Sequence, residues 1–120
     1  MKTFSILCAV GLVVFASSWA AGQTNRGNPR EGQAIYEKHC LRCHGEKLDG
    51  EGPDGQYLIV RPANFQSVVS RAKTDWELLI TIANGALFSP MHGYRGELTD
   101  QQMLDVLSYI RTTAPPEFIS

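Results

Sequence analysis

The residues of this chain that are best suited to chemistry are two cysteines and a histidine in the run Cys40-Leu41-Arg42-Cys43-His44. Two thiols three residues apart, followed at once by an imidazole, form the C-x-x-C-H pattern of haem c attachment. On one helical turn the two sulfurs can form thioethers with the vinyl groups of a haem, and the imidazole can bind the iron as its proximal ligand. A bare C-x-x-C also occurs in zinc sites and in thiol–disulfide exchange, so the surroundings must decide between these chemistries.

The first 20 residues have the pattern of a secretory signal peptide. A charged start is followed by the apolar run Phe4 to Phe15, and Ser18-Trp19-Ala20 places small residues before a cleavage point. We expect cleavage after Ala20, with Ala21 or Gly22 as less favoured ends, and therefore a periplasmic, soluble protein without a membrane span. An uncleaved anchor is the alternative, although the apolar run is shorter than the ~20 residues of a spanning helix.

Export bears on the fate of the cysteines. Cys8 lies in the apolar run after Leu7, which argues against lipidation, and it leaves with the signal peptide. Cys40 and Cys43 then remain, and a disulfide across a single turn closes too small a loop to stabilise much. The βαβ pattern of a thioredoxin-like dithiol is absent. Thioethers to one covalent haem c account for both sulfurs, and haem c is attached outside the cytoplasm.

Length and charge limit the remaining possibilities. A chain of 120 residues has room for one domain. Its formal net charge is −1, and because Lys2 is the only charged residue before position 21, the mature chain has a charge of −2. This excludes the basic footprint of a nucleic-acid-binding protein. Partner proteins would be attracted by local patches rather than by the total charge.

Helix signals open the mature domain. Residues 21–28 are polar and glycine-containing, and we expect a flexible leader there. Asn28 suits the N-cap, Pro29 the first helical position and Glu31 the acid of a capping box, so a helix should run from there to Cys40. Gly32 lies on the same face as Tyr36, and a glycine inside a helix suggests either close approach of another backbone or a merely tolerated residue.

Two further helices follow, each with a capping box. Thr74-Asp75-Trp76-Glu77 precedes an apolar run that Asn84-Gly85 should stop. We expect this helix to be largely buried, with Trp76 in the core or near a haem edge. Thr99 to Gln102 begins the last helix, with Leu98 and Met103 as a hydrophobic staple. Pro115-Pro116 prevents its continuation. Its apolar residues recur at helical spacing: Met103, Val106, Leu107 and Ile110.

The stretch from Gly45 to Phe65 is rich in glycine and proline and must be loop. A loop of this length is unusual in a compact domain unless something fills its inside, as a haem would. Its apolar side chains could line a haem pocket or belong to an ordinary core: Tyr57, Leu58, Ile59, Val60 and Phe65. Its acidic residues are either a solvated loop or a patch that attracts a partner.

A haem bound by His44 needs a second axial ligand. Met103 is accounted for by the staple, and His39 adjoins Cys40 on the wrong side of the chain to oppose His44. Met91 lies 47 residues after His44, in a loop between two helices, and can reach the other face of the ring. We therefore predict Met91 as the distal ligand, with His92 or an open sixth position as the alternatives.

Taken together, these motifs resemble those of small monohaem class I c-type cytochromes of the bacterial periplasmic type. The resemblance rests on Gly32-x-x-Ile35-Tyr36, the C-x-x-C-H run, Arg61-Pro62-Ala63-Asn64-Phe65, Pro90-Met91 and Val106-x-x-Tyr109-Ile110. It implies an all-α cytochrome c fold of about three main helices around one covalent haem, with long loops. It also implies that the first and last helices cross at Gly32, and that a loop proline carbonyl, from Pro62 or Pro53, accepts the proximal imidazole N–H.

The expected domains are a signal peptide at 1–20, the leader at 21–28, a cytochrome domain at 29–114 and a tail at 115–120. The expected function is that of a periplasmic one-electron carrier and not an enzyme. Its partners would be redox proteins such as a dehydrogenase, an oxidase or a cytochrome complex. The alternatives are an electron-accepting haem subunit of a larger dehydrogenase, and a haem sensor of small gases that loses Met91 from the iron on reduction.

Overall fold

The computed structural model describes residues 26–117, so the predicted signal peptide and most of the leader lie outside the described residues. The helices are α1 (Pro29–His39), α2 (Leu41–His44), α3 (Val68–Arg71), α4 (Asp75–Asn84) and α5 (Asp100–Thr113), with a 3₁₀ turn, η1 (Gly55–Tyr57). No strand occurs in this part of the chain, which confirms the all-α prediction; α2, η1 and α3 are short additions to the three predicted helices. None of the helices between residues 26 and 117 has the length and apolarity to cross a membrane.

The predicted helix starts are confirmed at all three long helices. The Asn28 side chain accepts the N–H of Arg30 at 3.0 Å, with Pro29 at the first position of α1. Full capping boxes begin α4 at Thr74 and α5 at Thr99. The prediction that Glu31 completes a capping box is wrong, because the N–H of Asn28 donates to Asp105 Oδ1 on α5 at 2.7 Å.

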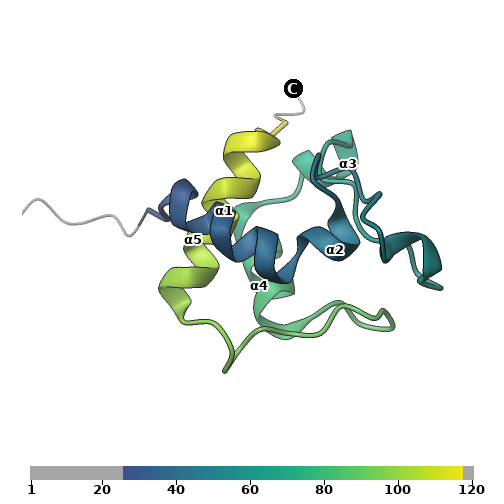
Figure 1. Ribbon diagram of the computed structural model, residues 1–120. Helices are drawn as coiled ribbons and strands as arrows, with labels where there is room; N and C mark the ends of the chain where they lie inside the picture. The colour runs from purple at the N-terminus through teal and green to yellow at the C-terminus, as the bar shows by residue number, and fades with distance from the viewer. Residues whose placement is uncertain (1–25, 118–120) are drawn as a thin grey trace, which may run out of the picture.

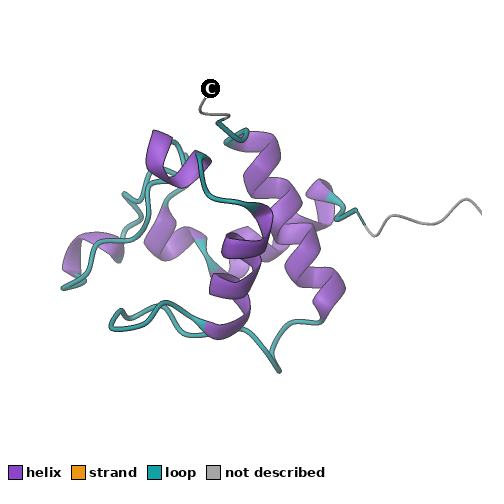
Figure 2. Ribbon diagram, turned by 180° about the vertical axis from the view of Figure 1, so that it is seen from behind, coloured by secondary structure: helices purple, strands orange, loops and turns teal. Residues whose placement is uncertain are grey.

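Helices α1 and α5 cross in direct contact (Figures 1 and 2). A Cβ atom on Gly32 would overlap the backbone carbonyl of Asp105, so only glycine fits at this crossing. Gly27, in the expected leader, lies equally close to the carbonyl of Leu104. The expectation that Gly32 marks the approach of another backbone is confirmed, and the crossing fixes α1 relative to the rest of the fold.

The core lies between α1, α4 and α5. Tyr36 is almost fully buried, its ring lies 5.3 Å from that of Tyr109, and its hydroxyl donates to the carbonyl of Gly45 at 2.7 Å. Leu98 and Met103 are both buried, as the staple predicted. The other buried apolar residues of this cluster are Leu48, Leu78, Ile82, Ala83, Tyr94, Val106, Leu107 and Ile110.

Helix α4 buries one face only. Leu78 and Ile82 are four residues apart and face the core, whereas Trp76 is 69% exposed. The prediction that Trp76 packs in the core is wrong. Its position two residues before Leu78 turns it to the opposite side of the helix, because successive residues rotate by about 100°.

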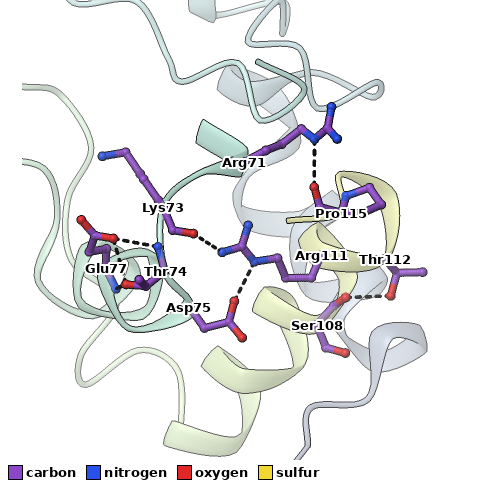
Figure 3. A network of polar contacts seen from close by, with 9 residues as sticks. All are labelled: Arg71, Lys73, Thr74, Asp75, Glu77, Ser108, Arg111, Thr112 and Pro115. Carbon is purple, nitrogen blue, oxygen red and sulfur yellow. Dashed lines mark hydrogen bonds and ion pairs between the residues drawn. The ribbon is translucent and has the colours of Figure 1, made fainter. Parts of the chain in front are cut away.

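A polar network joins the end of α5 to the segment between α3 and α4 (Figure 3). Arg111 donates to Asp75 Oδ1 at 2.7 Å and also to the carbonyl of Lys73. Arg71 donates to the carbonyl of Pro115 at 2.9 Å and pairs with Glu117. The contacts of Arg71 hold the chain that follows α5 against α3. The contacts of Arg111 connect α5 with the start of α4 and the loop before it.

The crossing at Gly32 predicts that replacing this glycine by alanine destabilises the protein, although the same substitution usually stabilises a helix. Gly32→Ala removes a flexible residue from a helix and would stabilise α1 by about 0.5–1 kcal/mol if space were available. Because the added methyl meets a backbone carbonyl, we expect a net destabilisation of about 1–3 kcal/mol instead. The melting temperature of the haem-bearing protein measures it, with about 4–8 °C expected for each kcal/mol. Gln33→Ala, on the exposed side of the same helix, should change stability by less than about 0.5 kcal/mol. A rise in melting temperature for Gly32→Ala would contradict the close contact.

Candidate functional site

The run Cys40–His44 forms a single turn at the end of α1. Cys40 has helical backbone angles and joins α1 to α2, and its carbonyl accepts the N–H groups of Cys43 at 3.2 Å and of His44 at 2.9 Å. Both cysteines are half-buried and carry free thiols. One helical turn therefore carries the two thiols and the imidazole.

His44 is buried and held in one orientation. Its Nδ1 lies 3.1 Å from the carbonyl oxygen of Ala63, and in the neutral tautomer that fits this contact Nδ1–H donates while Nε2 keeps its lone pair. Burial lowers the pKa of His44, and the bond to Ala63 opposes that shift only in part. A neutral imidazole with one nitrogen hydrogen-bonded and the other available is the form that ligates a metal.

The prediction that Pro62 or Pro53 supplies this carbonyl is wrong: Ala63, directly after Pro62, supplies it. The nearby N–H of Phe65 donates to the carbonyl of Leu48 at 2.8 Å, and this pairing brings residue 63 to the histidine. Phe65 also stacks on His44, with ring centres 4.7 Å apart and planes at 24°. A backbone acceptor has no side-chain signature, so the sequence could indicate the segment but not the residue.

The glycine-rich loop wraps closely around α2. The N–H of Gly50 donates to His44 O at 2.8 Å and that of Gly52 to Cys43 O at 3.1 Å. A Cβ atom on Gly52 would overlap the carbonyls of Leu41 and Arg42, so a side chain there would push the loop away. The loop thereby satisfies the carbonyl groups that the end of a helix leaves without partners.

Arg42 and Asp54 fasten the same loop from outside. The guanidinium donates two bonds to the carboxylate, at 2.6 and 2.9 Å, and the N–H of Asp54 donates to the carbonyl of Arg42 at 2.8 Å. The hydrogen bonds from Arg42 hold the pKa of Asp54 below its usual value. Arg42 lies between the two cysteines, so this pair ties the loop directly to the attachment turn.

The thiol of Cys40 is not tuned for redox exchange. Burial, with a smaller effect of the neighbouring Cys43, raises its pKa to about 12. Reactive C-x-x-C dithiols have lowered thiol pKa values, because the thiolate is the nucleophile. The environment of Cys40 therefore disfavours the thiol–disulfide alternative. Within residues 26–117, no group of three or more His, Cys, Asp or Glu side chains is arranged to hold a metal ion.

Met91 lies half-buried in a loop whose base is tightly closed. Gly85 and His92 form a β-bridge, and the N–H of Ala86 donates to the carbonyl of Met91 at 3.1 Å. A Cβ atom on Gly93 would overlap the backbone of Asn84, so the two arms of the loop are in contact. The loop projects from the same side of the α1–α5 pair as the glycine-rich loop (Figures 1 and 2).

The other candidate ligands occupy different environments. Met103 is buried in the core, where the staple places it. His39, at the end of α1, packs its ring edge-on to Tyr94 with centres 5.6 Å apart. His92 is exposed, and its Nε2 lies 3.3 Å from Glu97 Oε1.

Tyr94 is a residue of this site that the sequence analysis did not identify. It is buried, and its hydroxyl donates to the carbonyl of His39 at 2.9 Å. Burial raises its pKa to about 12, so the hydroxyl stays protonated and remains a donor. An aromatic residue three positions after Met91 was the available signal, but its partner lies 55 residues earlier in the chain.

The loops that follow α2 and α4 carry large apolar side chains in solvent. Exposed fractions are 80% for Tyr57, 101% for Ile59, 85% for Leu87 and 91% for Phe88. Large apolar side chains left in solvent are available to be covered by an apolar ligand or partner. Two thiols, an oriented neutral imidazole and apolar loops fit a covalently attached haem.

Comparison with known proteins agrees with this site. The family model described as cytochrome C oxidase, cbb3-type, subunit III matches residues 27–110. The chain belongs to this family. It is a family of class I c-type cytochromes, so the resemblance seen in the sequence and the cytochrome c fold are both confirmed. The domain is a haem electron-transfer domain, an electron carrier that is not itself catalytic.

Two solved structures are similar to this cytochrome. One is the reducing HAO-like protein complex of Kuenenia stuttgartiensis, with 26% identity, a TM-score of 0.64, and 74% of this chain covered. The other is dihydro-heme d1 dehydrogenase NirN, with 28% identity, a TM-score of 0.54, and 75% of this chain covered. The aligned region makes up 43% of the first chain and 17% of the second. A search of curated proteins found no match.

The Arg42–Asp54 pair predicts a pH-dependent contribution to stability. Because the folded protein lowers the pKa of Asp54, the pair stabilises the fold fully above the usual pKa of 3.8 and is lost as the pH falls through the lower, folded value. Asp54→Asn should therefore melt below wild type at neutral pH, and the difference should vanish in strong acid.

High salt should also reduce the difference, because the pair is exposed. Glu46→Gln, an exposed acid of the same loop, is the matched control and should show no such pH-dependent gap. A gap between Asp54→Asn and wild type that persists in strong acid would refute the assignment.

Proposed function

We propose that this protein is an exported, periplasmic one-electron carrier with a single haem c. Thioethers from Cys40 and Cys43 attach the haem, His44 is the proximal iron ligand and Met91 the distal ligand. The observation that carries the proposal is the turn in which both thiols accompany a buried imidazole hydrogen-bonded to Ala63. When bound, the haem supplies iron that cycles between Fe(II) and Fe(III).

The chain's own residues would favour this redox cycling by limiting reorganisation and by setting the reduction potential. The Ala63 carbonyl keeps the His44 ring in one orientation, which limits reorganisation between the two redox states. A thioether ligand such as Met91 favours Fe(II) and raises the reduction potential, as does a poorly hydrated, apolar pocket. With His44 and Met91 holding the iron, a bound haem would offer no coordination site to a substrate and would supply only electron transfer to a partner protein.

A second candidate function is that of an electron-accepting haem subunit in a larger dehydrogenase. It is supported by the two similar structures, one of a multi-protein complex and one of a dehydrogenase, in which the aligned region is less than half of each chain. The size of the haem-bearing species in a periplasmic extract separates the two. A carrier elutes at the size of the single chain, whereas a subunit elutes in a larger species.

The haem assignment is tested by absorption spectra of protein exported by a host that attaches haem c. Wild type should retain its haem after denaturation and acid–acetone extraction, because thioethers survive both. The oxidised protein should show the weak band at the red end of the spectrum that marks a thioether sulfur on Fe(III). Met91→Ala should lose this band and have a lower midpoint potential, since the ligand that favours Fe(II) is removed.

His92→Ala is the matched control for the neighbouring position and should keep both the band and the potential. A wild-type spectrum that lacks this band, and that changes in His92→Ala but not in Met91→Ala, would assign the distal site to His92. Extractable haem in wild type would refute the attachment itself. A five-coordinate iron in the reduced wild type, open to a small gas, would favour the gas-sensor alternative.

A further inference from the structure

Tyr94 joins two parts of the site that are distant in the sequence. Its backbone follows the Met91 loop, where its N–H donates to the carbonyl of Ile82 at 2.9 Å. Its ring lies 4.4 Å from that of His92 in the loop and 5.6 Å from that of His39 on α1. Its hydroxyl reaches the carbonyl of His39, the residue directly before Cys40, at 2.9 Å.

No other hydrogen bond in the described part of the chain makes this connection. Between residues 26 and 117, the remaining hydrogen bonds of segment 85–98 stay within residues 81–98. They close the loop at its base and join it to the end of α4. Within residues 26–117, the bond from Tyr94 to His39 is thus the only hydrogen bond from this segment to the helix that leads into the attachment turn.

The geometry of this hydrogen bond also suits a residue that keeps the Met91 loop at a fixed distance from α1. Tyr94 is buried and has an aromatic ring with few rotatable bonds, so the distance between its backbone and its hydroxyl is nearly constant. The His39 carbonyl belongs to the last turn of α1, where carbonyls lack helical partners. The bond therefore satisfies α1 while it fixes the end of the Met91 loop relative to Cys40.

We propose that Tyr94 is a positioning residue that sets the spacing between the Cys40–His44 turn and the Met91 loop, and so keeps the Met91 sulfur on the iron. This inference rests on the proposed function, in which Met91 is the distal ligand. Tyr94 touches neither reacting atoms nor substrate in this role. It acts by keeping the loop closed.

Competition with an added ligand measures that closure. Imidazole binds ferric iron only after Met91 has left, so its apparent affinity is the intrinsic affinity multiplied by the fraction of open loop. Tyr94→Phe keeps the ring and removes the hydroxyl. Because one intramolecular hydrogen bond contributes about 0.5–1.5 kcal/mol, its loss should raise the apparent affinity for imidazole roughly two- to tenfold.

The experiment is a spectroscopic titration of the oxidised, haem-bearing protein with imidazole. Tyr94→Phe should show the thioether band of wild type before addition, and lose it at two- to tenfold lower imidazole concentration. Thr74→Ala is the matched control, because it removes the N-cap of α4, at the opposite end of that helix from the Met91 loop, and should cost similar overall stability. Its imidazole affinity should equal that of wild type.

The results distinguish failure of the positioning role from failure of Met91 as the ligand. An unchanged affinity in Tyr94→Phe overturns the positioning role while leaving Met91 as ligand, provided that Met91→Ala binds imidazole much more tightly than wild type. An equal rise in Thr74→Ala also overturns it, because general destabilisation would then explain the effect. If Met91→Ala binds imidazole as wild type does, Met91 is not the ligand, and both proposals fail.

Discussion

The close contact between α1 and α5 is the constraint on which the site depends. Gly32 lets the two backbones touch, and the buried Asp105 accepts the N–H of Asn28 at the start of α1. Because α1 runs directly into Cys40, fixing its axis also fixes where the attachment turn begins. The Tyr36 hydroxyl, bound to Gly45 beyond the turn, holds the other end of α2 on the same helix. The Cys40–His44 turn is thus positioned from both sides by a helix that contains neither of the two cysteines nor His44.

Helix starts and contact faces could be predicted from the sequence because their causes are local. The Thr74 and Thr99 capping boxes and the Gly85 stop each depend on residues within one turn. Gly32 and Tyr36 indicated a crossing because they share one helical face. Trp76 shows the limit of such a prediction. Its large apolar ring favoured burial, but its position around the helix relative to Leu78 leaves it exposed to solvent.

The site itself could be predicted only where side chains carry the chemistry. Cys40, Cys43 and His44 were identified from type and spacing, and the structure places them on one turn. The acceptor for His44 is a backbone carbonyl, which any residue supplies, so its number depends on how a long loop pairs with Leu48. Tyr94 was missed for a related reason. Its partner is also a carbonyl, and nothing in the residue type at position 39 indicates that bond.

The two halves of the site are held by different means, and this difference bears on function. The proximal side is fixed by many backbone contacts: the glycine-rich loop bonds to the carbonyls of α2, and Ala63 bonds to His44. The Met91 loop is closed at its base but tied to α1 by the hydroxyl of Tyr94. A single side-chain bond is removed by one substitution of that side chain, whereas a substitution that keeps the backbone path leaves a set of backbone bonds in place. Under the proposed function, the Met91 loop would therefore be where substitutions tune the ligation and the potential without disturbing haem attachment. Leu87 and Phe88 of the same loop are exposed.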